Sequence, residues 1–439
     1  MKNQKLESFL CKASPVTFSL IAAVLSFSTY FCMYAFRKPF SVGHYNTTLS
    51  LGPFGDGQLK IMLIFFQIIG YTLSKFIGIK VVSESAGANK ARLIIMLISV
   101  ALVALFCFGL TGPSYLGLIC LFFNGLPLGM IWGLVCEYLE GRKTSDFLFA
   151  ALSTSFIVAS GAVKSIGRLI LSYGINEYWM PFMVGLIFYP LLLLSVYLLN
   201  SIPEPTNEEK ALRCSRPPMN EDERKLFFKS FAPGLVLFTA FYMILTAFRD
   251  FRDNFAREIW DSLGYAASPE IFTLSEFPIA IGCLVLMGSF TLFKDKTTFF
   301  GIGLVTILSM LLVGVSTWLF QLGQLDPVLW MVLSGLGLYL AYIPFGCILY
   351  DNLMGLLKFS GTAGFMIYVS DAFGYLGSVG LLFYKNFARP NISWLNFFTQ
   401  LNYVICFVGG ILIILGNIYF YRKVFRPSSF NRIADVIHS

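Results

Sequence analysis

Charged residues are scarce in this chain of 439 residues, since Asp, Glu, Lys and Arg together make up only 13%. Apolar residues make up 56%, and phenylalanine alone occurs 46 times. An ordinary globular protein is about 25% charged and could not hide this much apolar surface from water. The composition therefore excludes a soluble enzyme, a nucleic-acid-binding protein and a disordered chain. The net charge of +8 is typical of a membrane protein with basic cytoplasmic loops.

Residues that hold metals or cofactors are also scarce. The chain has two histidines, His44 and His438, and none of its nine cysteines forms a Cys-x-x-Cys motif. Metal and haem sites need such residues at close spacing, so we expect no metal and no cofactor. We interpret the cysteines as small apolar residues of helices. No cluster of catalytic residue types indicates an enzyme.

Long apolar runs dominate the chain, and a bilayer core about 30 Å thick needs about 20 apolar residues per helix. Twelve runs meet this requirement, at residues 17–40, 58–80, 91–111, 113–137, 147–172, 178–199, 230–255, 268–292, 298–320, 326–350, 361–384 and 397–421. The first is too long for the core of a signal peptide, so we interpret it as a retained span. We predict an all-α membrane protein with an N-terminal six-helix bundle (1–200), a cytoplasmic linker (201–229), a C-terminal six-helix bundle (230–422) and a cytoplasmic tail (423–439).

The distribution of Lys and Arg predicts the orientation of these spans. With the N-terminus inside, 21 basic residues fall on inner segments and only Arg257, Lys385 and Arg389 on outer ones. Cytoplasmic loops carry such an excess of positive charge. We therefore expect both termini in the cytoplasm.

A further set of basic residues lies within or at the ends of the apolar spans: Arg37, Lys38, Lys75, Lys164, Arg168, Arg249 and Arg252. Lys60 lies there too, but its long side chain can reach the outer interface, so we set it apart. Each of the others would cost at least about 2.5–3.5 kcal/mol if it faced lipid at mid-depth, so we expect them inside the bundle. The acids at similar positions are fewer, namely Asp250, Asp253, Glu276 and Asp371, with Asp351 and Glu137 as further candidates. A cavity with surplus positive charge suits a small anionic solute. The alternative is that every base forms a salt bridge that only steadies the bundle.

Arg37 and Arg249 lie at equivalent depths of spans 1 and 7, 212 residues apart. This offset, near half the chain, is expected for a parallel repeat of two six-helix bundles. Arginine binds phosphate or carboxylate oxygens bidentately. We therefore predict that the two guanidinium groups bind one anion between the halves.

Several motifs carry a resemblance to a known family: Tyr34-x-x-Arg37-Lys38-x-Phe40, Gly70-Tyr-x-x-Ser74-Lys75-Phe76, Gly125-x-x-x-Gly129-Met130-x-Trp132, Tyr342-x-Pro344, and Gly361-Thr-Ala-Gly-Phe365 with Phe373-Gly-Tyr-Leu-Gly377. In this order they resemble the organophosphate:inorganic phosphate antiporters of the major facilitator superfamily. The chain departs from that pattern at Asp371 and lacks a histidine in span 5. The resemblance implies a bacterial inner-membrane carrier that exchanges a phosphorylated metabolite for phosphate.

The resemblance also implies roles for particular residues. The substrate would contact Arg37, Arg249, Lys75, Lys38, Lys164, Tyr34 and Tyr342, and coupling or gating would involve Glu276, Asp371, Arg168 and Arg252. In this fold spans 1, 4, 7 and 10 line the cavity, while spans 2 and 11, and 5 and 8, meet across the halves. We therefore predict that Lys75 pairs with Asp371 and that Lys164 pairs with Glu276. These pairs would leave Arg37 and Arg249 free for ligand.

Two other functions remain open at this point. The protein could be a receptor that binds a phosphorylated metabolite without transporting it. It could also carry another anion, such as a carboxylate or a nucleotide, and Lys164 and Arg168 would suit a larger or more highly charged solute. In each case we expect the partners to be a small anionic solute and the lipid bilayer, with the protein acting as a monomer.

Overall fold

The computed structural model describes residues 3–50, 56–84, 90–140, 142, 144–206, 221–290, 295–357, 364–389 and 391–425. Residues 207–220 of the predicted linker, 426–439 of the predicted tail and 361–363 of the span-11 motif lie outside them. Eleven helical stretches of this part are long and apolar enough to cross a membrane. A further helix, α16 (Gly364–Phe383), occupies the predicted eleventh span. Each of the twelve predicted spans therefore corresponds to a helix, which confirms an all-α membrane protein.

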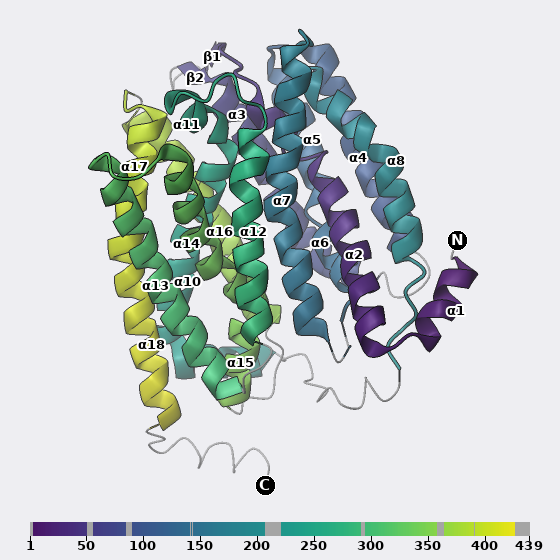
Figure 1. Ribbon diagram of the computed structural model, residues 1–439, viewed down its shortest axis with the longest axis vertical. Coiled ribbons are helices and arrows are strands. Elements are labelled where there is room, and N and C mark those ends of the chain that lie inside the picture. The colour runs from purple at the N-terminus through teal and green to yellow at the C-terminus, as the bar shows by residue number, and fades with distance from the viewer. Residues whose placement is uncertain are drawn as a thin grey trace.

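The N-terminal half begins with a short helix, α1 (Gln4–Lys12), ahead of the first span. Its remaining helices are α2 (Pro15–Tyr34), the 3₁₀ helix η1 (Pro39–Val42), α3 (Leu59–Glu84), α4 (Lys90–Thr111), α5 (Tyr115–Leu128), α6 (Ile131–Cys136), α7 (Ser145–Ser172) and α8 (Met180–Leu199). Two short strands, β1 (Thr48–Ser50) and β2 (Asp56–Gln58), pair antiparallel with Thr48 opposite Gln58. This hairpin is the one departure from an all-helical chain among the described residues. We call the end of the bundle that carries it, with α11, the hairpin end; it is the predicted outer side (Figure 1).

The C-terminal half follows the same plan. Its helices are α10 (Glu221–Asn254), α11 (Ala256–Ser262), α12 (Ile271–Phe290), α13 (Asp295–Gln321), α14 (Pro327–Cys347), α15 (Leu349–Leu356), α16, α17 (Trp394–Val404) and α18 (Gly410–Phe425), with π-helical turns η3 (Tyr384–Ala388) and η4 (Ile405–Gly409). The twelfth predicted span is therefore built from α17, η4 and α18.

The helices pack into two groups that lie side by side (Figure 1). In the N-terminal group α2 packs on α7 and α8, and α5 packs on α3 and α4; in the C-terminal group α10 packs on α16 and α18, and α14 packs on α12 and α13. The groups meet along α7 and α12, and less extensively along α3 and α16. These are the contacts predicted between spans 5 and 8 and between spans 2 and 11, so the structure confirms them.

Small residues permit the closest helix contacts. A Cβ atom at Gly125 of α5 would overlap the carbonyl oxygen of Gln67 in α3, and one at Gly161 of α7 would overlap that of Phe272 in α12. Glycine at these positions lets the backbones approach closely, as is usual where helices pack in membranes. Gly161 therefore lies directly on the interface between the two halves.

Span 1 is interrupted just where Arg37 lies. Helix α2 ends at Tyr34, and η1 begins at Pro39 after a short turn. Proline has no backbone N–H with which to continue the helical hydrogen-bond pattern, which accounts for the break. The side chain of Gln67 donates to the carbonyl oxygen of Arg37 at 3.0 Å, and Asn124 donates to that of Phe36 at 3.0 Å. These two buried amides satisfy carbonyl groups that the break leaves unpaired. The continuous helix predicted over 17–40 was therefore wrong at its end.

Candidate functional site

A small polar cavity lies between the two halves. It encloses about 10 Å³, which is about the room that one water molecule needs. It is lined by Tyr34, Arg37, Lys38, Phe156, Ser160, Arg249, Asp250, Asp253 and Tyr339. The predicted substrate residues Tyr34, Arg37, Lys38 and Arg249 are thus brought together, and both halves contribute to the wall. The cavity is too small for a solute larger than water, so binding such a solute needs the halves to separate.

Arg37 is the basic group of this cavity that has no counter-ion among the described residues. Its residue is 5% exposed, and its guanidinium carbon lies 3.8 Å from the centre of the Tyr71 ring. Its side chain forms no hydrogen bond or ion pair with a described residue, and Nε is buried without a partner. An aromatic face stabilises a cation but does not neutralise it. Arg37 therefore places an uncompensated positive charge at the wall of the cavity, as predicted.

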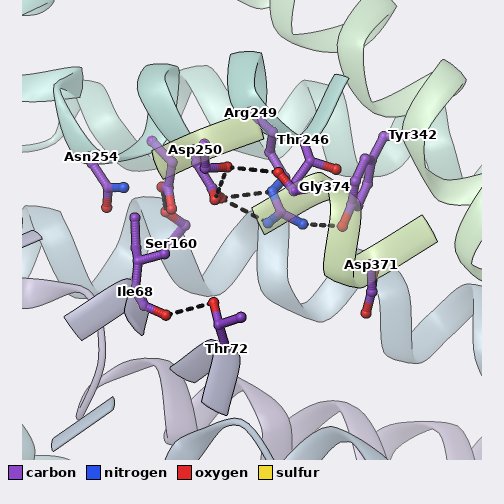
Figure 2. Close-up of polar contacts among 12 residues, drawn as sticks. Ile68, Thr72, Ser160, Thr246, Arg249, Asp250, Asn254, Tyr342, Asp371 and Gly374 are labelled. Atoms are coloured by element: carbon purple, nitrogen blue, oxygen red, sulfur yellow. Dashed lines mark hydrogen bonds and ion pairs between the residues drawn. The ribbon is translucent and has the colours of Figure 1, made fainter. Parts of the chain in front are cut away.

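Arg249 differs from Arg37 because it is already paired. Its Nη2 lies 2.7 Å from Oδ1 of Asp250, and its Nε donates to the same oxygen at 3.1 Å. Its Nη1 donates to the Tyr342 hydroxyl, and Figure 2 shows the guanidinium held between Asp250 and Tyr342. Ser378 donates to the other oxygen of Asp250 at 2.7 Å. The prediction that both arginines are free for ligand was therefore wrong for Arg249. Its neighbour in the sequence supplies the counter-charge.

Asp253 of α10 binds two lysines of the opposite half. Lys38, next to Arg37, and Lys164 of α7 both form ion pairs with it, and the Ser160 hydroxyl also donates to it. Lys38 additionally donates to Oδ1 of Asn254 at 3.0 Å. Lys38 and Lys164 are each 3% exposed, so this cluster is shielded from water. Lys38 and Lys164 are therefore bound to an internal carboxylate that itself lines the cavity.

The predicted pair of Lys164 with Glu276 does not form. Glu276 of α12 instead accepts a hydrogen bond from Nη1 of Arg252 at 2.6 Å, and Arg252 also donates to the carbonyl oxygen of Met331. Both partners belong to the C-terminal half. The face of α7 from which Lys164 projects places it next to Asp253. The face of α10 from which Arg252 projects places it next to Glu276. Arg252 and Glu276 do not line the cavity, and their ion pair joins α10 to α12 within the C-terminal half.

The predicted pair of Lys75 with Asp371 is confirmed. Nζ of Lys75 in α3 lies 3.3 Å from Oδ2 of Asp371 in α16, across the two halves. The Tyr242 hydroxyl donates to Oδ1 of Asp371 at 2.8 Å and lies 3.0 Å from the Tyr342 hydroxyl. Lys75 and Tyr342 thus lie near the cavity without lining it. Because α3 starts at the hairpin end, Lys75 lies about 24 Å along its axis toward the opposite end.

Further ion pairs join the halves at the hairpin end. Nη2 of Arg168 lies 2.6 Å from Oδ1 of Asp261, and Lys60, which is 4% exposed, pairs with Glu258. Arg257 donates to the carbonyl oxygen of Val42. Arg168 therefore forms an ion pair between the two halves and does not line the cavity. The hairpin end is closed by several polar contacts, whereas Lys75–Asp371 is the cross-half ion pair toward the other end among the described residues.

Sequence patterns identified the charged residues of the site better than its neutral ones. Gln67, Asn124 and Ser160 had no assigned role, although polar side chains within apolar spans are a usable signal. Tyr71 could not be distinguished from the many other aromatic residues of the chain. Among the described residues, no group of three or more His, Cys, Asp or Glu is arranged to hold a metal ion.

The fold is similar to that of solved solute transporters of the major facilitator type. A structure described as "D-xylose-proton symporter" aligns over 94% of this chain and 98% of its own, with a TM-score of 0.58 and 15% identity. A mutant form of "nucleoside transporter NupG" aligns over 92% of this chain and 99% of its own, with a TM-score of 0.54 and 13% identity. No curated protein matches the sequence. One family model, "Family of unknown function (DUF5690)", matches residues 39–423. The protein therefore belongs to this family, and it is a multi-pass membrane protein of the major facilitator fold.

Proposed function

We propose that the protein is a secondary transporter that moves a small organic anion across the membrane by alternating access. The fold it shares with solute transporters supports this proposal, as does a small polar cavity between the two halves. The single observation that carries the proposal is Arg37. It is a buried guanidinium at the cavity wall with no carboxylate partner among the described residues.

An anion would complete the environment of Arg37. A buried charge without a counter-ion costs several kcal/mol, and a bound phosphate or carboxylate group would remove much of this cost. The planar guanidinium offers two parallel N–H donors for such a group. Arg37, Lys38 and Arg249 line the cavity against Asp250 and Asp253. Lys164 also pairs with Asp253, so the cluster carries a surplus of two positive charges. This surplus supports a solute with one anionic group, whereas a highly charged nucleotide would require Asp253 or Asp250 to move away.

Binding of an anion would also promote movement of the carrier. Closing the empty cavity traps the unpaired charge of Arg37 away from water, and closing it around an anion does not. A ligand can shift a conformational equilibrium only through such a difference in affinity between two states. The loaded carrier should therefore close and reopen more readily than the empty one. The resemblance to the organophosphate antiporters favours a phosphorylated metabolite that is exchanged for inorganic phosphate.

Exchange of labelled inorganic phosphate tests the proposal. Proteoliposomes loaded with phosphate should take up labelled phosphate when they contain the wild-type protein, and Arg37→Met should abolish this uptake. Arg92→Met serves as a control, because Arg92 is an exposed residue at the start of α4. Equal uptake by Arg37→Met and wild type would contradict the assigned role. Phosphate-dependent thermal stabilisation without flux would favour the receptor function instead.

We also propose that the protein works as a monomer in a bacterial inner membrane, with both termini in the cytoplasm. An even number of spans places both termini on one side, and the distribution of Lys and Arg supports the inner side. Tags at the two termini should both resist protease added outside spheroplasts and be cleaved after lysis. Cleavage of either tag in intact spheroplasts would contradict the orientation.

A further inference from the structure

We propose that the transported anion carries an aromatic ring, which binds between Phe156 of α7 and Tyr339 of α14. This inference rests on the proposed function and narrows its substrate to esters of phosphate with aromatic alcohols. Arg37 would hold the phosphate group, and the two aromatic residues would hold the ring. All three residues line the same cavity, so one small molecule can contact all of them.

The wall of the cavity is aromatic where it is not charged. Apart from its charged residues and Ser160, the cavity is lined by Tyr34, Phe156 and Tyr339. The guanidinium carbon of Arg37 lies 5.9 Å from the centre of the Tyr34 ring. Phe156 belongs to the N-terminal half and Tyr339 to the C-terminal half, and the centres of their rings are 6.0 Å apart. A solute in the cavity therefore meets an aromatic side chain from each half, beside the cation that would bind its phosphate group.

Phe156 and Tyr339 have no stacked aromatic partner among the described residues. Their two ring planes are inclined by 49° to each other. The other aromatic neighbours of Phe156 are Trp132 at 6.3 Å and Tyr342 at 6.4 Å, inclined by 59° and 85°. For comparison, two rings of α13 and α14 stack in parallel with their centres 4.0 Å apart. Phe156 is also only half-buried, so a ring of the solute could stack on it without displacing a stacked neighbour.

A small separation of the two halves makes room for such a ring. A ring stacked between two others needs about 7 Å between their centres, since carbon atoms in contact are about 3.5 Å apart. The centres of the Phe156 and Tyr339 rings are 6.0 Å apart. They would therefore have to move apart by about 1 Å and become parallel. Because α7 and α14 belong to opposite halves, opening of the cavity separates the two residues, and closing presses them onto the ring.

The polar groups of the cavity suit a phosphate ester whose ring has no hydroxyl groups. Asp253 already binds two lysines and the Ser160 hydroxyl, and Asp250 already binds Arg249 and Ser378. A sugar phosphate would bring several hydroxyl donors, and each donor that is buried without an acceptor weakens binding. An aromatic ring brings no such donors. The charge of a phosphate monoester near pH 7, about −1.5 to −2, matches the surplus of two positive charges in the cluster.

Two phosphate esters of equal carbon number separate aromatic stacking from simple apolar contact. Phenyl phosphate has a flat aromatic ring, whereas cyclohexyl phosphate has a puckered saturated one. Each is added as a competitor to the exchange of labelled inorganic phosphate in proteoliposomes. Two aromatic contacts should let phenyl phosphate inhibit at a concentration about tenfold lower than cyclohexyl phosphate. Glucose 6-phosphate, whose ring carries hydroxyl groups, should be the weakest of the three competitors.

Phe156→Leu removes the ring and keeps an apolar side chain, so the ratio of the cyclohexyl to the phenyl inhibitory concentration should fall from about ten to about one. The ratio is taken within each variant, so a change in the overall exchange rate does not affect it. Phe182→Leu is the matched control. Phe182 is also a half-buried ring of the N-terminal half, but it contacts Phe106 at 5.3 Å and does not line the cavity, so the wild-type ratio should persist. A ratio near one in wild type, an unchanged ratio in Phe156→Leu, or stronger inhibition by glucose 6-phosphate than by phenyl phosphate would overturn the inference.

Thermal unfolding with each ester distinguishes this inference from the proposed function. At equal concentration, phenyl phosphate should raise the unfolding midpoint of the wild type more than cyclohexyl phosphate does, and this difference should disappear in Phe156→Leu. Equal stabilisation by the two esters, or stabilisation by neither, would refute the aromatic site. Selective stabilisation by phenyl phosphate without exchange of labelled phosphate would support the aromatic site and count against the proposed transport alone.

Discussion

Replacing each of the two cavity arginines by methionine should have opposite effects on stability. Arg37 and Arg249 were predicted to be equivalent, but in the structure Arg249 is bound to Asp250 whereas Arg37 has no counter-ion among the described residues. Methionine has a similar length, no charge and a favourable contact with aromatic rings. The comparison therefore isolates what each positive charge contributes to the folded protein.

The structure sets the size of the two effects. Arg249→Met leaves Asp250 buried with Ser378 as its remaining hydrogen-bond partner among the described residues, and removing one member of a buried ion pair costs about 3–5 kcal/mol. Arg37→Met loses the contact with the Tyr71 ring, worth about 2 kcal/mol when desolvated. It also removes an unpaired buried charge, whose cost is several kcal/mol. We therefore expect Arg37→Met to range from no change to a gain of about 2 kcal/mol.

Thermal unfolding in detergent measures the difference. At about 2 °C per kcal/mol, Arg249→Met should lower the midpoint by roughly 6–10 °C, and Arg37→Met should leave it unchanged or raise it. Phosphate at 100 times its dissociation constant should stabilise the wild type by about 2.7 kcal/mol and should not stabilise Arg37→Met. A midpoint that falls equally in both variants would refute the reasoning, because it would show that Arg37 also has a counter-charge in the folded state.

Three further predictions follow from the same contacts. Asp253→Asn leaves two buried lysines without their counter-ion, so it should lower stability by about 3–5 kcal/mol; an unchanged unfolding midpoint would contradict this. Gly161→Ala should push α7 away from α12 and slow phosphate exchange. Gly380→Ala on α16 is the control: no atom lies within 4 Å of the added Cβ, so the exchange rate should stay unchanged. Burial and then the positive charge of Arg257 lower the pKa of His44, so the native state disfavours its protonated form. Stability should therefore fall as the pH drops below the unfolded-state value of about 6.5, and His44→Gln should reduce this loss in unfolding midpoints at pH 5.5 and 7.5.

The sequence predicted the helices well and the polar contacts less evenly. Long apolar runs and their breaks located every span, because helix formation in a bilayer is decided within about 20 residues. Lys75 and Asp371 were paired correctly, since they were placed on two spans that meet across the halves. The same argument failed for Lys164 and Glu276. It specified which helices meet, but not which of several nearby charges each side chain reaches.

The end of the first span shows a different limit. Pro39 is a local signal for a break, yet the break is stabilised by Gln67 and Asn124, which are distant in the sequence. Their role depends on α3 and α5 packing beside α2, and no local pattern contains that information. The position of Arg37 at the cavity follows from this break as much as from its depth in the span.

The sequence by itself determined that the chain lies in a membrane, how many times it crosses, and that positive charges are buried within it. These properties depend on the transfer of each segment from water to lipid, which is a local quantity. Tertiary structure alone decided which charges are neutralised. Successive residues of a helix point about 100° apart, so a small rotation exchanges one partner for another. That is why Asp250 pairs with Arg249 and Asp253 with Lys38 and Lys164, while Arg37 lines the cavity without a counter-ion in the part of the chain that the structure describes.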